Sequence, residues 1–597
     1  MKNQQDFHAL KTFRLAALLF GFQLLTGSVA VNAADVGRDI TTPRVEAFPR
    51  EGKGYTLIDW HQRAEDFLSF TLDPVRKGDY LPLLWWDDSK IHWKETTFGL
   101  PSYVGMKNQW GVFGKEHEGI VSMGLLISGT LLGKDMTQYG VPGSAQPVNL
   151  VRMQEAYFSP EDGVFLNSIN GRSGGSFWYE ITPNLFAGAL VSAYPQEKAL
   201  TDKWQKSCER WAQATLQLWQ LNDFNFQAYD LRSKRATTQR WREPDSAAAL
   251  AYLMQMAFAK WPEEKKFYHE TRHALDWLCA QERSINYEFF PSFGVYAAAR
   301  CNAEQNTSYD VGKIFGWCFE DSAVRGIGPQ EKDISKGDGW GVVCGRWGEH
   351  DIAGLVGVSR GALSTPKHRG GYAFAMETFV YAWPLVAATR YDNRLARAVG
   401  KWMHAAVHSA RHFYPDQLPP EKQTDWAWAS KYSTAIPYEG LMEKNNQSGE
   451  PGPFGSGDPS NHGWGPLNLG IYSGALSGLF GSLVKATNVE GVLAIDTCKT
   501  DFFAKPSFPT TLLYNPRLTP VKVKLQVGDK PVRVWDAISN SWLGEPVTRE
   551  IEIMIAPDGA VLATLVPSEQ QTRFAQGKLY AGNVIVDFSA STPATTL

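Results

Sequence analysis

The fold of this chain is constrained above all by a long succession of helical segments joined by short connections. After Asp245, apolar side chains recur at helical spacing at Leu250, Leu253, Met254, Ala257 and Trp261. Further helices are predicted at residues 57–72, 118–132, 146–158, 181–194, 197–219, 263–282, 292–303, 309–318, 372–390, 394–412 and 464–485. Short connections make successive helices antiparallel, and pairs that bury apolar faces on both sides favour a closed toroid of helical hairpins. A solenoid would need a repeat period, which the sequence lacks.

The character of the chain changes between residues 504 and 509. From there on, short runs rich in β-branched and aromatic residues alternate with Pro, Gly, Asp and Asn, at residues 510–515, 521–527, 532–536, 549–555, 560–566 and 578–588. This pattern predicts a small all-β, sandwich-like domain. The predicted organisation is a helical catalytic domain at 34–505 and a β-sandwich domain at 506–597.

The first 33 residues have the pattern of an export signal. Lys2, Lys11 and Arg14 come before or at the start of the apolar run 15–25, and Val31-Asn32-Ala33 supplies a small-x-small end. The run is too short for a comfortable membrane span, and no later segment is long and apolar enough. We therefore expect a cleaved signal peptide at 1–33, a secreted or periplasmic location and no membrane span.

Composition narrows the classes of partner and reaction. The formal net charge is −3, and no basic face points to nucleic acid. The signatures GxSxG, HExxH and GxxxxGK[ST] of serine esterases, zincins and P-loop enzymes are missing. The six cysteines form no CxxC pair and do not decide between thiols and disulfides, so neither a metal nor a cofactor is predicted. The oligomeric state is not predicted.

A glycine- and tryptophan-rich stretch at residues 337–379 is the first candidate site. It shows little helical or strand periodicity before about Gly371, and it concentrates charged side chains beside aromatic rings. With 22 Trp, 22 Tyr and 32 Phe in the chain, broad rings are available beyond core needs for stacking on sugars. We expect this stretch to line a carbohydrate site, the alternative being a surface loop held by its own salt bridges.

Asp351 and Glu439 are the predicted catalytic carboxyls. Asp351 stands where a glycine-rich loop enters an apolar segment, a position that a helix N-cap would also explain. Its neighbour His350 is placed to tune the carboxyl pKa. Glu439 lies between Tyr438 and Gly440, and a partly apolar setting would raise its pKa as a general acid requires. The alternative for Glu439 is a loop glutamate paired with a lysine such as Lys431.

The remaining candidates are predicted to bind substrate. Tyr179 and Glu180 follow a glycine turn, although Glu180 also suits the first turn of a helix. Asp458, His462 and Trp464 lie in a Gly-, Pro- and Asn-rich segment, where ordinary turn chemistry is the alternative. Arg346, His368 and Arg369 would pair with a substrate carboxylate, unless Arg346 instead packs on Trp347. Tyr372 would be the base of an elimination reaction, with His350 or His462 as its partner.

The overall organisation resembles the six-hairpin, (α/α)6, carbohydrate-active enzymes of bacteria. More specific similarity is to bacterial proteins near the β-glucuronidase-type hydrolases of glycoside hydrolase family 154, and it is carried by the runs SFWYE, REPDSAAAL, YDVGKIFGWCFE, GRWGEHDIAGLVG, GGYAFAMETF and TNVEGVLAIDTCKTDFF. The same build also occurs in polysaccharide lyases, so the resemblance narrows the substrate class more than the reaction.

Three functions follow as hypotheses. The first is an exported glycoside hydrolase that cleaves an acidic, uronic-acid-containing oligo- or polysaccharide with paired carboxyls. The second is a polysaccharide lyase acting by β-elimination, with Tyr or His as base and Arg neutralising the uronate. The third is a non-catalytic glycan-binding protein.

Overall fold

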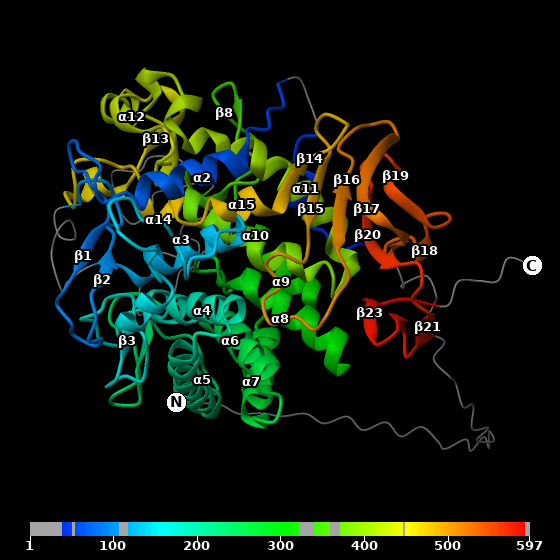
Figure 1. Ribbon diagram of the computed structural model, residues 1–597, viewed down its shortest axis with the longest axis horizontal. Helices are drawn as coiled ribbons and strands as arrows, with labels where there is room; N and C mark the ends of the chain where they lie inside the picture. Colours follow the sequence, from blue (N-terminus) through cyan, green and yellow to red (C-terminus); the bar gives the residue numbers. More distant parts are fainter. Residues whose placement is uncertain are drawn as a thin grey trace, which may run out of the picture. The chain divides into compact units, whose positions relative to one another are not determined.

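The computed structural model (Figure 1) describes residues 39–50, 54–106, 117–320, 322, 340–358, 371–445 and 448–591. Every element below belongs to the unit Asp39–Leu597. The signal peptide predicted at 1–33 lies outside the described residues and stays a prediction. Within the described ranges, no helix combines the length and the apolar character needed to cross a membrane.

Five helices are buried almost throughout their length, and we call them the inner helices. They are α3 (Gly119–Leu131), α4 (Phe177–Ala193), α6 (Ser246–Lys260), α8 (Phe290–Gln305) and α10 (Ala375–Ala388). They pack in a cyclic order, α3 on α4, α4 on α6, α6 on α8 and α8 on α10. The short helices α14 (Ile471–Gly474) and α15 (Gly478–Leu483) pack on both α10 and α3 and so close the order.

A second set of helices covers the inner ones and buries only one face or stripe. These are α2 (Trp60–Thr71), α5 (Lys198–Gln220), α7 (Lys265–Ala280) and α9 (Val311–Phe319). α11 (Ala396–Ser409) packs on α10 and is itself buried along nearly its whole length, because strands of the C-terminal region contact it as well. α5 buries Leu200, Trp204, Trp211 and Leu218 and packs against α4, α6 and α7. The helical part with a strand-rich C-terminal region that the sequence predicts is therefore present. Short helices complete the set at α1 (Pro43–Glu46), α12 (Trp426–Tyr432) and α13 (Asp458–His462).

The described parts of the stretch 337–379, at 340–358 and 371–379, contain more regular structure than their sequence suggests. They supply three strands, β7 (Trp340–Val342), β10 (Val356–Val358) and β11 (Tyr372–Phe374), to an antiparallel sheet of order β13-β12-β11-β10-β7. The other two are β12 (Gly440–Lys444) and β13 (Pro451–Ser456). Such short strands contain glycines where chains meet closely, since a Cβ on Gly357 would lie 2.1 Å from the Tyr372 carbonyl oxygen. Glycine obscures the alternation by which strands are recognised.

Small two-stranded hairpins decorate the helical part. They are β1 (Trp85–Asp87) with β2 (Thr97–Gly99), β3 (Phe158–Ser159) with β4 (Val164–Phe165), β5 (Ala228–Asp230) with β6 (Arg235–Thr237), and β8 (Arg346–Trp347) with β9 (His350–Asp351). The last of these carries four of the predicted site residues.

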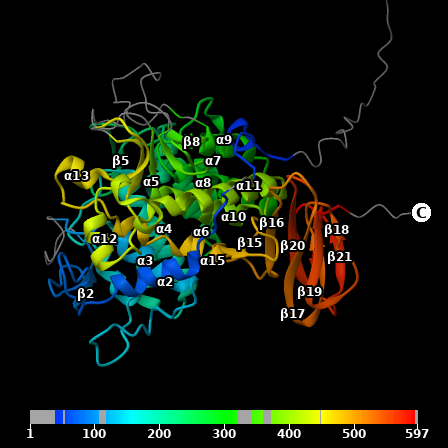
Figure 2. The ribbon, with the colours of Figure 1, turned by 90° about the horizontal axis from the view of Figure 1, so that it is seen from above.

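The C-terminal region is built from two antiparallel sheets (Figures 1 and 2). A seven-stranded sheet contains β14 (Val484–Ala486), β15 (Leu493–Asp496), β16 (Thr510–Tyr514), β17 (Val521–Asp536), β18 (Ser541–Trp542), β19 (Val547–Ile555) and β20 (Ala560–Pro567). A three-stranded sheet contains β21 (Thr572–Ala575), β22 (Lys578–Ala581) and β23 (Val584–Asp587). The large sheet thus starts at β14, ahead of the boundary predicted after residue 505.

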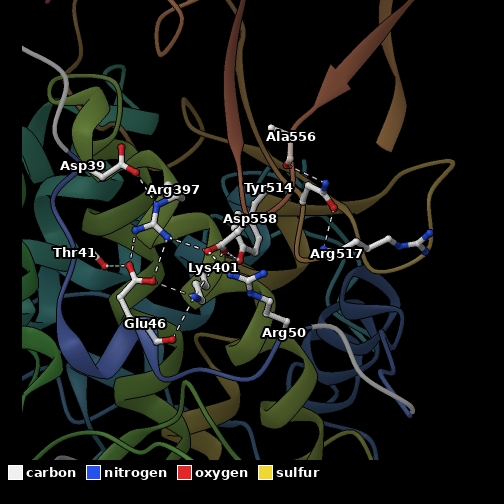
Figure 3. A network of polar contacts seen from close by, with 11 residues as sticks. Asp39, Thr41, Glu46, Arg50, Arg397, Lys401, Tyr514, Arg517, Ala556 and Asp558 are labelled. Carbon is white, nitrogen blue, oxygen red and sulfur yellow. Dashed lines mark hydrogen bonds and ion pairs between the residues drawn. The ribbon is translucent and has the colours of Figure 1, made fainter. Parts of the chain in front are cut away.

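A network of charged side chains joins the N-terminal segment, α11 and the β region (Figure 3). Arg397 of α11 pairs with Asp39 at 2.6 Å, with Glu46 and with Asp558 of the β19–β20 turn at 3.4 Å. The buried Lys401, one turn further along α11, pairs with Glu46 at 3.3 Å and with Asp558 at 3.7 Å. These contacts fix where α11 meets the large sheet, against which it packs at β16 and β20.

Candidate active site

A pocket of about 520 Å³ lies where the inner helices begin. Glu118 precedes α3, Trp178 and Tyr179 open α4, Tyr287 and Glu288 precede α8, and Glu377 lies in the first turn of α10. The described lining residues are Ser102, Tyr103, Met106, Glu118, Ser176, Trp178, Tyr179, Trp241, Tyr287, Glu288, Phe374, Glu377, Glu439, Asp458, His462, Trp464 and Tyr472. The pocket therefore collects side chains from segments more than 300 residues apart in the sequence, and its volume suits a small ligand.

The lining combines acidic groups with aromatic rings. It contains the five carboxyls of Glu118, Glu288, Glu377, Glu439 and Asp458. Seven of its members are Tyr or Trp, and His462 is the sole basic side chain among the described lining residues, with no Lys or Arg beside it. A hollow of this kind offers carboxyls for acid–base chemistry and for binding hydroxyl groups, together with flat faces for stacking.

Glu439 lines the pocket immediately before β12, and its side chain is only 2% exposed. Tyr103 donates to its Oε1 at 2.8 Å and Tyr472 donates to the same oxygen at 2.9 Å. Its Oε2 accepts from the Tyr372 hydroxyl at 3.0 Å and from the backbone N–H of Asp458. Burial and, after it, the nearby Asp458 carboxylate raise the pKa of Glu439 to about 7, although these hydrogen bonds oppose the shift.

Asp458 and its neighbours form the wall beside Glu439. Asp458 begins the short helix α13, where it lies partly exposed in the pocket. His462, one turn on, lies 3.7 Å from the Asp458 carboxylate, and its ring stacks on Trp464 with centroids 4.7 Å apart. The structure therefore brings Glu439, Asp458, His462 and Trp464 into one pocket. Tyr179 from α4 lines the same pocket.

Glu180 and Tyr372 lie behind the pocket and are not among its described lining residues. Glu180 Oε1 accepts from the backbone N–H groups of Gly174, Gly175 and Ser176, so its carboxyl holds the glycine turn before α4. Burial raises the pKa of Glu180 to about 8. Tyr372 is fully buried in β11 and touches the site through its hydrogen bond to Glu439. Glu180 thus holds the turn before α4, and Tyr372 holds the Glu439 carboxyl, without lining the pocket themselves.

The hairpin β8–β9 holds Arg346, Trp347, His350 and Asp351 away from this lining. Asp351 is half-buried, and its Oδ1 accepts from the Ala353 backbone N–H at 3.0 Å, a local turn bond of the capping type. Burial raises the pKa of Asp351. Arg346 is exposed, Trp347 is buried, and the His350 ring lies 4.8 Å from that of His412. The predicted partners Asp351 and Glu439 are thus not brought together in this pocket, whereas His368 and Arg369 lie outside the described residues.

Several lining residues were not singled out from the sequence. They are Tyr103, Glu118, Trp178, Trp241, Tyr287, Glu288, Glu377 and Tyr472. Trp178 and Glu377 belong to the runs SFWYE and GGYAFAMETF. The resemblance of these runs to known enzymes therefore pointed to two lining residues that residue type alone did not indicate. A glutamate at a helix start is ordinarily explained by its interaction with the helix dipole, so Glu118 and Glu377 do not stand out in the sequence as site residues.

The described residues show no arrangement suited to a bound metal. No group of three or more His, Cys, Asp or Glu side chains among them could hold an ion. All six cysteines are free thiols.

Comparison with known proteins gives weak likenesses. No protein-family model and no curated protein sequence matches the chain. A solved structure described as a glycoside hydrolase aligns over 92% of this chain and 85% of its own, at 10% identity and a TM-score of 0.36. The glucoamylase of Hormoconis resinae aligns over 90% and 96%, at 10% identity and a TM-score of 0.30.

A family 27 β-L-arabinopyranosidase from Geobacillus stearothermophilus matches at 12% identity with a TM-score of 0.12, and the match spans 22% of this chain and only 36% of that enzyme. These neighbours are described as a glycoside hydrolase, a glucoamylase and a β-L-arabinopyranosidase, and all three TM-scores are below 0.5.

Proposed function

We propose that this protein is an exported glycoside hydrolase whose active site is the pocket at the start of the inner helices. The observation that carries the proposal is the pairing of Glu439 and Asp458 in an acidic, aromatic-lined hollow, with the pKa of Glu439 raised to about 7. Hydrolysis of a glycosidic bond needs two carboxyls, of which one is protonated at the working pH.

In this proposal Glu439 is the general acid and Asp458 the second carboxyl. With a pKa of about 7, Glu439 is protonated in a substantial fraction of the molecules in neutral solution, and it would deliver this proton to the leaving oxygen. Tyr103 and Tyr472 can follow that change, because a hydroxyl accepts a hydrogen bond as readily as it donates one. Asp458, more exposed than Glu439, would activate water or attack the sugar directly.

We also propose that the helices form a six-hairpin toroid. The cyclic packing order of the inner helices supports this, as does the outer layer that includes α2, α5, α7 and α11. The gathering of pocket residues at the starts of the inner helices supports it too, since a ring of helices places those ends together.

The lining favours an uncharged glycan over a uronic acid. The lining carboxyls other than Glu439 would, when ionised, repel a substrate carboxylate, and none of the described lining residues is Lys or Arg. The acidic substrate predicted from Arg346, His368 and Arg369 stays untested, since Arg346 lies elsewhere and the other two are outside the described residues. The elimination alternative finds less support, because burial raises the pKa of Tyr372 well above its usual value and the hydroxyl keeps its proton.

The test is hydrolysis of a panel of nitrophenyl glycosides and disaccharides, in which neutral sugars are compared with uronic acids. We expect turnover of a neutral member, with kcat lowered about 10²–10⁴-fold in both Glu439→Gln and Asp458→Asn. Asp351→Asn is the matched control and should keep activity within a few-fold. Loss of activity in Asp351→Asn alone, with Glu439→Gln and Asp458→Asn active and folded, would overturn the assignment.

A further inference from the structure

One wall of the pocket is tied together by a buried carboxyl that does not itself line it. Glu243, just before α6, is fully buried. Its Oε1 accepts from the Trp241 indole Nε1 at 2.6 Å and from the Ser176 hydroxyl at 2.8 Å, and its Oε2 accepts from the Trp178 backbone N–H at 2.7 Å. All three donors belong to pocket-lining residues on two different segments of the chain.

The side chain of Trp178 presents a donor that the fold leaves unused. It is 7% exposed, and its indole Nε1 is buried with no hydrogen-bond partner in the described part of the chain. Its ring is held edge-on by Phe289, with centroids 5.6 Å apart, and by Tyr179 at 4.6 Å. A buried N–H without an acceptor is costly, and an oxygen of a bound ligand would remove that cost.

We infer that Trp178 is a substrate-binding residue whose indole N–H donates to a hydroxyl or ring oxygen of a neutral sugar, and that Glu243 is the positioning residue that sets the Trp178–Trp241 wall. The inference rests on the proposed function for the identity of the ligand. Glu243 fixes Trp178 through its backbone and Trp241 through its indole, so both rings are placed by one carboxyl. A purely structural Glu243 would merely cap the start of α4.

Two pairs of variants separate these roles. Trp178→Phe keeps a ring and removes the donor, and Trp277→Phe is its control at a similarly buried tryptophan in α7. In the wild type both oxygens of Glu243 accept hydrogen bonds. Glu243→Gln replaces one of them by an NH₂ group, which then faces another hydrogen-bond donor. Glu270→Gln is its control, at a buried glutamate outside the lining. Should Glu243→Gln fail to fold, Ser176→Ala removes one of its three bonds more gently.

The first readout needs no turnover. In protein labelled with ¹⁵N-tryptophan, the indole resonances of Trp178 and Trp241 are assigned by their loss in Trp178→Phe and Trp241→Phe. We expect Glu243→Gln to move at least one of them and Glu270→Gln to move neither. We expect one of maltose, cellobiose or lactose to shift the Trp178 indole resonance downfield, as a new acceptor would. Unmoved resonances in a folded Glu243→Gln protein would overturn the positioning role.

The second readout is kinetic, on the neutral glycoside that the wild type hydrolyses. Trp178→Phe should lower kcat/KM about tenfold, mainly through KM, whereas Trp277→Phe should stay within about twofold. No shift of the Trp178 indole with any of the three disaccharides, together with an unchanged KM in Trp178→Phe, would overturn the binding role. Absence of hydrolysis with a sugar-dependent Trp178 shift would instead contradict the proposed function and leave this binding site standing.

Discussion

Three buried carboxyls at or near the pocket have similar positions relative to a helix start but different hydrogen-bond partners. Glu180, Glu243 and Glu377 all stand within a turn of a helix start. Glu377 lines the pocket, Glu180 holds a glycine turn, and Glu243 ties two tryptophans. Each would be read as a dipole or capping residue from sequence alone, because the groups that bond to them come from distant segments.

The hydroxyl of Tyr472 lowers the pKa of Glu439 from the value that burial would set. Tyr472→Phe should therefore raise that pKa above about 7 and move the basic limb of the kcat/KM profile to higher pH, since the acid then keeps its proton longer. The matched control is Tyr309→Phe, which removes a hydrogen bond of 2.9 Å from the tyrosine hydroxyl to the Asp276 carboxylate, outside the described pocket lining. A Tyr472→Phe profile that stays in place or moves to lower pH would count against Glu439 as the acid.

Glu180 makes stability depend on pH. Burial raises the pKa of Glu180 to about 8 from an ordinary value of 4.5, so the folded state holds this proton more tightly than the unfolded state. The resulting stabilisation is complete below about pH 4.5 and is lost as the pH rises to about 8. Glu180→Gln, whose amide oxygen can still accept from the glycine turn, should not show this loss.

The measurement is the difference in free energy of unfolding between Glu180→Gln and the wild type from pH 4 to pH 9. It should grow by several kcal/mol in favour of the variant, with the exposed Glu263→Gln as a flat control. A difference that is constant over this range would show that Glu180 does not titrate in it.

At the scale of elements, the helices divide by how much of their surface is covered. The inner helices are apolar around nearly the whole circumference, whereas α5 and α7 keep a polar face. This difference is visible in the sequence, and it predicted the long helices. The helix predicted at 146–158 is only a 3-10 helix at Arg152–Tyr157, and the single helix predicted at 464–485 is divided into α14, α15 and the start of β14. Short strands were predicted poorly, since β7, β10 and β11 have three residues each and contain or adjoin glycine. Their pairing depends on partners elsewhere in the chain.

The junction between α11 and the large sheet depends on Lys401. Its side chain is 3% exposed and faces Glu46 and Asp558, so its removal leaves two carboxylates with less compensation. Lys401→Ala should reduce the free energy of unfolding by about 2–4 kcal/mol. The exposed pair of Lys431 and Asp79 provides the control, and Lys431→Ala should leave the free energy of unfolding nearly unchanged. Equal effects in chemical denaturation would contradict a special role for the junction.

At the scale of the whole molecule, helices and sheets share a core. One continuous cluster of buried apolar residues includes Trp402 of α11 together with Leu512, Trp535 and Leu562 of the large sheet. At Gly400, α11 approaches β16 so closely that a Cβ would lie 2.7 Å from the Tyr514 Cβ. The helical part and the large sheet therefore behave as parts of one packed body.

Calorimetry of the protein should accordingly show one unfolding transition rather than separate ones for the helices and the sheets. Gly400→Val should lower the temperature of that transition, because the added side chain forces α11 and β16 apart. Two resolved transitions in the unmodified protein would show that the β region folds independently.

What the sequence determined by itself is local: helical periodicity, the β-rich end, and the aromatic and acidic chemistry around Tyr179, Glu439, Asp458 and Trp464. Only the tertiary structure decided which carboxyls meet. It placed Asp351 in a separate hairpin and brought Glu118, Glu288 and Glu377 to the pocket instead. The physical reason is that periodicity records which face of a helix is buried, whereas an active site depends on which helix ends lie together, and that is set by packing between segments hundreds of residues apart.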